Sequence, residues 1–165
     1  MKRYKVLFSS LDGTLIETIS GNTFPKGIWD MRFKFEVLDA IKKFVSETPI
    51  EFMYIVTNQE GIEKRLVDRE DLMNKVNYIC SAIKEYCNIP IVNFTYCDTN
   101  DPEDEWRKPN TKMLSTMLEL CNEDKEKCLM IGDASGLKGQ YSDTDKKAAE
   151  NFGIDYMDVN DFVKQ

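Results

Sequence analysis

The chain of 165 residues contains no histidine at all. This absence excludes Ser-His-Asp and Cys-His nucleophile systems, and zinc sites with a histidine ligand. Acid–base or metal chemistry must therefore use carboxylates, lysine, cysteine, tyrosine or the main chain. Positively charged residues are also fewer than negatively charged ones, with 22 Lys and Arg against 29 Asp and Glu and a formal net charge of −7. This acidic balance argues against non-specific attraction to nucleic acid, which depends on Lys and Arg neutralising phosphates.

Long hydrophobic runs and paired cysteines are absent as well. No apolar run approaches the ~20 residues that a membrane helix needs, and the short run at residues 6–8 is too small for a signal-peptide core. The five cysteines form no CxxC pair and their number is odd, so we interpret them as reduced thiols. We therefore expect a soluble, cytoplasmic protein with no membrane partner.

Length and composition predict one domain over residues 1–165. Short apolar runs predict buried parallel strands at residues 6–8, 52–56, 91–96 and 128–131. Apolar residues at helical spacing lie between these runs: Phe35, Leu38, Ile41 and Val45, then Leu72, Val76, Ile79 and Ile83, then Met113, Met117, Leu120 and Cys121. A last strand and helix are expected within residues 154–163. This alternation predicts an α/β fold with a doubly wound, Rossmann-like parallel sheet.

The segments between these elements give further expectations. Asp68 and Ser142 are the predicted N-caps of the second and fourth helices. Residues 17–32 and 98–108 read as irregular loops. Sites in such folds lie beyond the carboxyl ends of the strands, so both loops are candidates for the border of a site.

Small polar residues follow the predicted strands. Ser10-Leu11-Asp12-Gly13-Thr14 follows the first, Thr57-Asn58 the second and Gly132-Asp133 the fourth, while Lys108-Pro109 ends the connection after the third. Main-chain N–H groups can bind phosphate, carboxylates can hold a hard cation, and lysine supplies a counter-charge. Each segment alone is also a common turn or helix start. Their recurrence at successive strand ends indicates a Mg²⁺-dependent phosphate site.

In this order, the chain resembles the haloacid dehalogenase-like (HAD) phosphatase superfamily over essentially its whole length. The superfamily's first motif, Asp-x-Asp-Gly-Thr, matches residues 10–14, and Thr57, Lys108 and Asp133 match the second, third and fourth motifs. Within the superfamily the chain is most similar to 3′-phosphatase domains of polynucleotide kinase/phosphatases, on residues 15–18, 21–25, 55–62, 107–109, 132–136 and 142–145. Only a short segment separates the first motif from the first helix, so no large cap domain is expected.

The resemblance implies a mechanism and a set of site residues. In the family, the first Asp of the opening motif attacks phosphorus and forms an aspartyl-phosphate, and the second, here Asp12, protonates the leaving oxygen and then activates water. Mg²⁺ is held by the first Asp, the main-chain carbonyl of Asp12, and Asp133. Asp145 is expected to cap a helix, to support the site, or both. The implied phosphate-binding positions are Leu11, Asp12, Thr57, Asn58 and Lys108.

Ser10 departs from the family because it occupies the position of the attacking Asp. The change removes the nucleophilic carboxylate, one anionic metal ligand and the labile acyl-phosphate, and no histidine is present to activate the hydroxyl. We expect binding of phosphorylated ligand with little or no turnover. Ser10 is either an introduced substitution that traps a competent enzyme, which the otherwise complete site favours, or a feature of a natural phosphate-binding protein.

The resemblance implies a 3′-phosphorylated polynucleotide end, DNA or RNA, as the partner. Lys26, Trp29, Arg32 and Lys34 would hold the terminal nucleotide, or they form an ordinary surface loop. A small phosphate ester, such as histidinol phosphate or a sugar bisphosphate, is the alternative substrate, although residues 98–106 lack the Cys/His zinc loop that such phosphatases often carry. A module that binds phosphorylated ends without processing them is the non-catalytic alternative.

Overall fold

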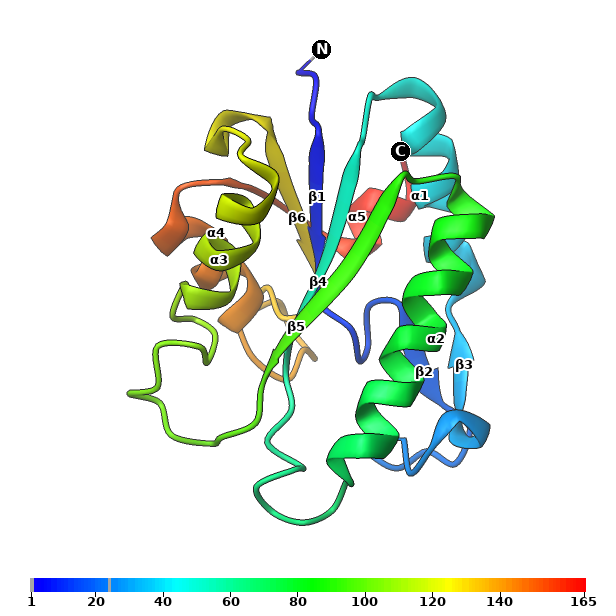
Figure 1. Cartoon of the computed structure of the whole chain (residues 1–165), viewed down its shortest axis with the longest axis vertical. Helices are drawn as coiled ribbons and strands as arrows, with labels where there is room; N and C mark the ends of the chain where they lie inside the picture. Colours follow the sequence, from blue (N-terminus) through cyan, green and yellow to red (C-terminus); the bar gives the residue numbers. More distant parts are fainter. Residues whose placement is uncertain (1, 24) are drawn as a thin grey trace.

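The computed structural model describes every residue except 1 and 24. Its centre is a five-stranded parallel sheet in the order β5-β4-β1-β6-β7 (Figure 1). The strands are β1 Val6–Ser9, β4 Phe52–Asn58, β5 Ile91–Cys97, β6 Cys128–Gly132 and β7 Asp155–Asp158. Every strand that the apolar runs predict is present. Ser9 lies opposite both Ile55 and Ile131, so the segments that leave β1, β4 and β6 emerge at one edge of the sheet.

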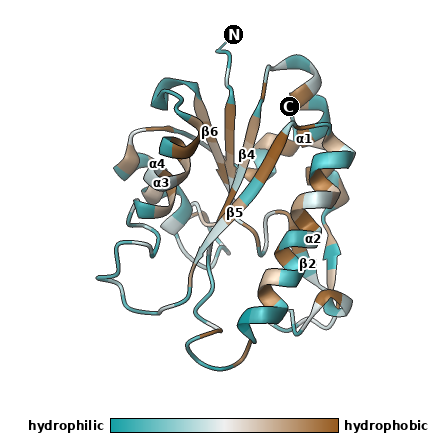
Figure 2. Ribbon diagram, in the orientation of Figure 1, coloured by the Kyte–Doolittle hydropathy of each residue, from teal (hydrophilic) through white to brown (hydrophobic). Residues whose placement is uncertain are grey.

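Helices cover both faces of this sheet, which confirms the predicted doubly wound arrangement. One buried cluster joins the sheet to α1 Phe35–Glu47, α2 Arg69–Cys87 and α5 Val159–Val163. A second cluster, on the opposite face, joins it to α3 Lys112–Cys121 and α4 Thr144–Phe152. Figure 2 shows hydrophobic residues along the central strands and hydrophilic residues in the loops at their lower ends.

Several predicted core positions are exposed instead. Phe35 is 56% exposed at the first residue of α1, and Leu120 is 68% exposed on the outer side of α3. In α3 the buried face is completed by Leu114 and Leu118, one turn apart. The apolar run at 91–96 predicts a buried strand, but β5 is the edge strand of the sheet, and all its residues except Cys97 are exposed or half-buried.

The segment 17–32 contains structure that its sequence pattern does not predict. β2 Ile16–Thr18 pairs antiparallel with β3 Met31–Phe33, and the short 3₁₀ helix η1 Ile28–Asp30 precedes β3. Strands of three residues are too short to show a period. The loop that closes this hairpin is held by the buried Asp30 carboxylate, which accepts hydrogen bonds from Ser20 N, Ser20 Oγ and Lys26 N at 2.8, 2.8 and 3.2 Å.

One of the two predicted helix caps is correct. The Asp68 side chain accepts a hydrogen bond from Asp71 N at 3.2 Å and caps α2. The prediction for α4 is wrong by one residue, because its N-cap is Asp143 and Ser142 lies one position earlier. All five cysteines are free thiols. Among the described residues, no helix combines the length and apolarity that crossing a membrane requires.

Candidate active site

The predicted site residues come from neighbouring strand ends. Ser10 and Asp12 follow β1, Thr57 lies near the end of β4, and Asp133 follows β6. Because β1 lies between β4 and β6 and all three run in the same direction, these segments meet at one edge of the sheet. This edge is at the bottom of the molecule as drawn in Figure 1.

Ser10 belongs to a compact cluster of hydroxyl and carboxyl groups. Its Oγ lies 2.5 Å from Thr14 Oγ1, and Thr14 Oγ1 donates to Asp133 Oδ1 at 2.8 Å. Since Thr14 has one hydroxyl hydrogen and donates it to Asp133, the Ser10 hydroxyl is the donor in the Ser10–Thr14 bond. The nearest carboxylate to Ser10 Oγ, Asp133 Oδ1, is 3.4 Å away. Within the described part of the chain, no carboxylate is therefore placed closely enough to accept the Ser10 proton well.

A tight turn brings the first motif against Asp133. The main-chain carbonyl of Leu11 accepts hydrogen bonds from Thr14 N and Leu15 N, at 3.1 and 2.9 Å. Gly13 has φ +83°, and a Cβ there would lie 2.1 Å from Asp133 Oδ2. Only glycine fits this conformation and this approach. The Leu11 side chain is fully buried in the core, so any contact of this predicted phosphate-binding residue with a ligand would use its main chain.

Gln59 joins Asp12 to Thr57, a role that the sequence pattern does not indicate. Its buried Nε2 donates to Asp12 Oδ2 at 2.8 Å and to Thr57 Oγ1 at 2.9 Å. Its main-chain N–H donates to the carbonyl of Cys97 at the end of β5. The only sequence signal for Gln59 is its place two residues after Thr57. The Gln59 amide fixes the position of one Asp12 oxygen.

Asn58 holds the segment that carries Lys108. Asn58 Nδ2 donates to the Lys108 carbonyl at 3.1 Å, and Lys108 N donates to Asn58 Oδ1 at 3.0 Å. Both polar atoms of the Asn58 amide are therefore engaged with the main chain of Lys108. The predicted residue is in the site, and its observed contacts position the lysine.

Lys108 and Asp145 form a buried ion pair. Lys108 Nζ lies 2.6 Å from Asp145 Oδ1, and both side chains are at most 5% exposed. Asp145 Oδ2 accepts a hydrogen bond from Ala134 N at 3.2 Å, and a Cβ on Gly132 would lie 2.4 Å from this oxygen. The Asp145 carboxylate thus contacts the site residue Lys108. Among the described residues, no hydrogen bond from the first turn of α4 reaches it, so these contacts agree with a role in holding the site and show no helix cap.

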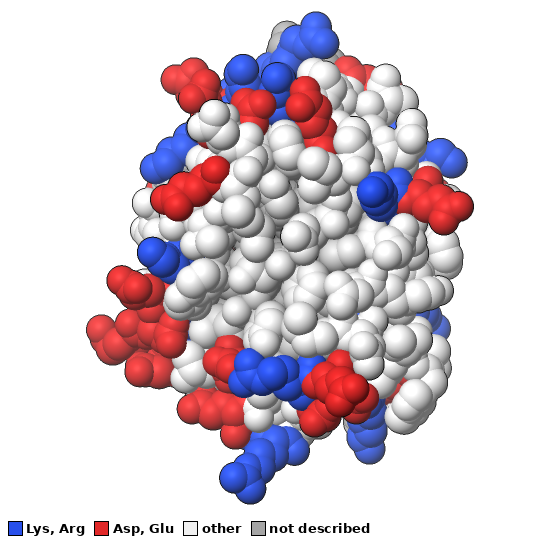
Figure 3. All heavy atoms as spheres, viewed as in Figure 1, with Lys and Arg blue, Asp and Glu red and all other residues white. Residues whose placement is uncertain are grey.

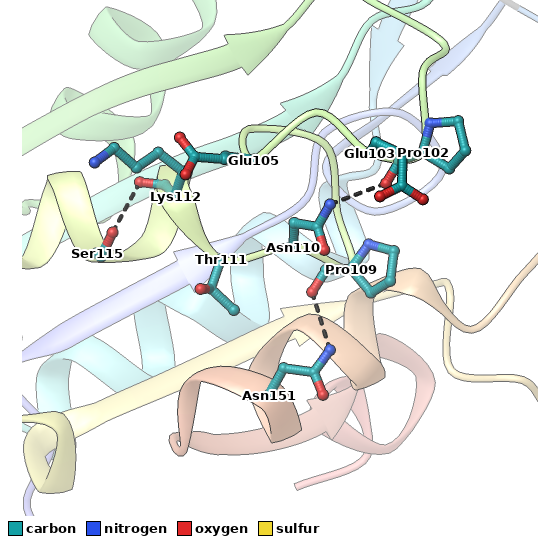
Figure 4. Close-up of a pocket in the computed structure, with 9 residues that line it drawn as sticks. All are labelled: Pro102, Glu103, Glu105, Pro109, Asn110, Thr111, Lys112, Ser115 and Asn151. Carbon is teal, nitrogen blue, oxygen red and sulfur yellow. Dashed lines mark hydrogen bonds between the residues drawn. The ribbon is translucent and has the colours of Figure 1, made fainter.

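A polar groove of about 570 Å³ is lined by Pro109 and Asn110, which directly follow Lys108 in the chain (Figure 4). Asn110 Nδ2 donates to the carbonyls of Pro102 and Asp104, and Asn151 Nδ2 donates to the carbonyl of Pro109. None of the groove's lining residues is a predicted site residue. These hydrogen bonds fix the main chain on either side of Lys108.

Asp133 is a partly buried carboxylate with spare acceptor capacity. Burial and the nearby Asp145 raise its pKa, against the hydrogen bond from Thr14 and the charge of Lys108. Among the described residues, no hydrogen bond reaches Asp133 Oδ2, and no three His, Cys, Asp or Glu side chains group as metal ligands. Mg²⁺ in proteins is commonly held by one or two carboxylates with water and substrate phosphate. The Asp133 carboxylate and nearby oxygens fit such a site when phosphate is also present.

The charged groups around this edge are largely paired. Arg69 lies 2.6 Å from Asp98, Arg107 lies 3.1 Å from Glu60, and Lys64 lies 3.4 Å from Glu60. Figure 3 shows blue and red side chains side by side at this end of the molecule. On the face that Figure 3 draws, the charges at this end are therefore mixed in sign.

The four residues considered for a terminal nucleotide are placed differently from one another. Lys34 Nζ donates to the main-chain carbonyl of Gly13 at 3.0 Å, so this lysine lies at the site. Arg32 pairs with Glu17 at 2.8 Å, and Lys26 contributes its main-chain N–H to Asp30. Trp29 is 71% exposed, which leaves its ring open for stacking.

Sequence comparisons match nearly the whole chain. A family model described as "Polynucleotide kinase 3 phosphatase" matches residues 5–162. The bifunctional polynucleotide phosphatase/kinase of Schizosaccharomyces pombe is 30% identical over 164 residues, which are 98% of this chain and 38% of that protein. An uncharacterised 20.8 kDa protein of Autographa californica nuclear polyhedrosis virus is 30% identical over 171 residues, with 99% of this chain and 87% of that protein covered.

Solved structures confirm the fold. The D,D-heptose 1,7-bisphosphate phosphatase of B. bronchiseptica, solved with magnesium and phosphate, aligns with a TM-score of 0.70. It is 19% identical to this chain, and the alignment covers 92% of this chain and 78% of that one. At this identity the likeness concerns the architecture alone.

Proposed function

Because the chain belongs to the polynucleotide kinase 3 phosphatase family of HAD-like phosphatases, we propose that its site binds the 3′-terminal phosphate of a polynucleotide. One observation carries this proposal. Asp12 and Thr57 share the Gln59 amide, while Ser10 and Asp133 share the Thr14 hydroxyl, at one edge of the sheet. The carboxylates, hydroxyls and lysine that phosphate chemistry needs are thus held by the protein itself.

The phosphoryl group is bound by Thr57 and Lys108. The Lys108 ammonium has three hydrogens, of which Asp145 takes one, so two remain for phosphoryl oxygens. Burial of this pair removes competing water and strengthens such bonds. Asn58 and Asp145 keep the lysine in place, from its main chain and from its side chain respectively.

Asp12 is the general acid of this proposal. Gln59 holds its Oδ2, and no hydrogen bond reaches its Oδ1 from the described residues. The free oxygen is available to pass a proton to the leaving oxygen of the ester and then to take one from water. Lys34 stabilises the same turn through the Gly13 carbonyl.

The metal of this proposal is Mg²⁺, which the Asp133 carboxylate and the main-chain carbonyl of Asp12 would hold, with Ser10 at the position of the family's other carboxylate ligand. When bound, Mg²⁺ would neutralise charge on the phosphoryl oxygens. Loss of one anionic ligand weakens binding of the metal in the absence of phosphate. Binding of the phosphorylated ligand and of Mg²⁺ should therefore be mutually dependent.

Ser10 makes the site a poor catalyst. Its hydroxyl donates to Thr14, and the nearest carboxylate oxygen is 3.4 Å away, so no base is well placed to deprotonate it. A phosphoserine, if formed, would be an ester and more resistant to hydrolysis than an acyl-phosphate. We propose that the chain retains phosphorylated ends with little or no release of phosphate.

Small phosphate esters are the competing ligands, since the B. bronchiseptica protein with the same architecture is named for a sugar bisphosphate. Between the first motif and α1, the described residues form only the β2–β3 hairpin and η1, which are too small to be a domain that encloses a small substrate. A site without an enclosing domain suits the end of a long chain.

Fluorescence anisotropy with matched oligonucleotides tests the proposal. With Mg²⁺, the chain should bind a 3′-phosphorylated oligonucleotide more tightly than the same sequence ending in 3′-hydroxyl, and a sugar phosphate should compete poorly. Lys108→Met should abolish this preference. Lys147→Met, at an exposed lysine paired with Asp143 on α4, is the matched control and should preserve it. Equal affinity for the two oligonucleotides would contradict the proposal.

A further inference from the structure

Lys75 is a buried cation beside the proposed site. It lies on the inner face of α2 with Leu72, Val76 and Ile79, and the residue is only 2% exposed. Within the described part of the chain, no hydrogen bond and no ion pair closer than 4.0 Å reaches its ammonium group. Burial of an ammonium group without a partner is unfavourable, so a fold retains one where a partner can arrive.

The ammonium group is not sealed inside the core. Every fully buried side-chain nitrogen or oxygen among the described residues has a hydrogen-bond partner. Lys75 Nζ has none, so it must border accessible space. The nitrogen therefore keeps a small solvent-accessible area although the rest of the side chain is covered.

The face of α2 that carries Lys75 packs toward the segment that carries Asp12, because Leu72 and Val76 belong to the same buried cluster as Leu11 and Ile16. Two carboxylates lie near the Lys75 ammonium group. Burial lowers the pKa of Lys75, while the charges of Asp12 and Asp30 act in the opposite direction. Neither acid takes a hydrogen bond from it: Asp12 Oδ2 accepts from Gln59, and both oxygens of Asp30 accept from the hairpin loop. Lys75 therefore lies on the part of α2 that packs beside the segment of the proposed general acid and the β2–β3 hairpin.

The packing of α2 agrees with this placement. In Figure 1, α2 runs beside β2 and β3, and its first turn lies at the same end of the molecule as the carboxyl ends of the strands. Lys75 is in the second turn of this helix. Tyr78, three residues later, packs its ring 6.3 Å from the ring of Phe33 in β3.

The region beside Asp12 is where the leaving group would lie, because Asp12 is the proposed donor of a proton to the leaving oxygen. We propose that Lys75 binds the nucleoside side of the ligand, donating a hydrogen bond to an oxygen of the terminal nucleotide. The acceptor is either a sugar oxygen or the phosphodiester that links this nucleotide to the next. This assignment rests on the proposed function and divides the ligand in two: Thr57 and Lys108 bind the phosphoryl group, and Lys75 binds what carries it.

Calorimetric titration of Lys75→Met with three ligands tests the assignment. The ligands are inorganic phosphate, a nucleoside 3′-monophosphate and a 3′-phosphorylated dinucleotide, each with Mg²⁺. Inorganic phosphate should bind the variant as it binds the parent, while affinity for a nucleotide should fall about tenfold or more. A loss already present with the mononucleotide identifies a sugar oxygen, and a loss confined to the dinucleotide identifies the phosphodiester. Lys84→Met, on the exposed side of the same helix, should change neither.

Thermal unfolding without ligand separates this role from a structural one. Lys75→Met should keep or raise the Tm, because methionine removes an unpaired buried charge at similar volume. A lower Tm, unchanged nucleotide affinity, or an equal loss for inorganic phosphate and nucleotide would overturn the assignment. If the parent chain binds none of the three ligands, the proposed function itself fails.

Discussion

Replacing Lys108 with methionine should destabilise the protein strongly, because it leaves the Asp145 carboxylate buried without its cation. The pair is separated by 2.6 Å, and neither side chain is more than 5% exposed. After the change, Asp145 keeps one hydrogen bond, from Ala134 N. Removing one member of a buried ion pair typically costs about 3–5 kcal/mol. We expect Lys108→Met to lower the free energy of unfolding by roughly this amount at pH 7.

The double variant Lys108→Met/Asp145→Asn distinguishes lost charge pairing from lost packing. It removes both charges, so most of the stability should return, to within about 1–2 kcal/mol of the parent. Urea unfolding followed by circular dichroism measures the stability of the parent, of Lys108→Met, of Asp145→Asn and of the double variant. A loss below about 1 kcal/mol for Lys108→Met, a value typical of exposed pairs, would refute the view that this pair is desolvated. Phosphate binding should be lost in every variant that lacks Lys108.

Three further predictions concern the surroundings of the site. Gly13→Ala should destabilise the protein measurably in urea unfolding, because φ is +83° and the new Cβ would meet Asp133 Oδ2; an unchanged midpoint would show that the turn can open. Burial raises the pKa of both Cys80 and Cys128 to about 12, so a thiol reagent at pH 8 should modify neither until the protein is unfolded, and rapid labelling of either would contradict their burial. Burial acts to raise the pKa of Asp30, but the hydrogen bonds that its carboxylate accepts outweigh burial, and the pKa is lowered overall. The ionised Asp30 therefore stabilises the fold above about pH 4, and this stabilisation is lost as the pH falls through the lowered pKa. Asp30→Asn should therefore show a smaller loss of stability between pH 7 and pH 3 than the parent, and parallel pH curves for the two proteins would refute this role.

Much of the fold follows from patterns that local sequence carries. Continuous apolar runs locate four strands of the central sheet, β1, β4, β5 and β6. The fifth, β7, has the sequence Asp-Tyr-Met-Asp and is anticipated only as a strand somewhere within residues 154–163. The first motif directly follows β1 and Asp133 directly follows β6, so their convergence follows from topology. The register of β1 with β4 and β6 then brings Ser10, Thr57 and Asp133 to one edge.

The contacts that complete the site depend on tertiary packing and leave little trace in local sequence. Gln59 contacts Asp12, which is 47 residues away, and Lys108 contacts Asp145, which is 37 residues away. In the described part of the chain, Lys75 is the one charged residue on the buried face of α2. The apolar spacing of Leu72, Val76 and Ile79 predicts that face but gives no reason for a lysine on it.

The errors have similar causes. The hairpin strands are three residues long, and so carry no measurable period. Phe35 and Leu120 fit the helical spacing of a buried face but are exposed. Local spacing does not show how much of a helix its neighbours cover. The edge position of β5 depends on strand order, which apolarity does not report.

The central claim is that this is a phosphatase site that lacks its nucleophile, and restoring the carboxylate tests it most directly. Ser10→Asp and the parent chain should be compared for phosphate release from a 3′-phosphorylated oligonucleotide in Mg²⁺, with Ser10→Asn as the control of similar size and no charge. We predict that Ser10→Asp releases phosphate at least roughly 10³-fold faster than the parent, the order of effect expected for a nucleophile, while Ser10→Asn stays inactive. Release by the parent at the rate of Ser10→Asp would contradict the account.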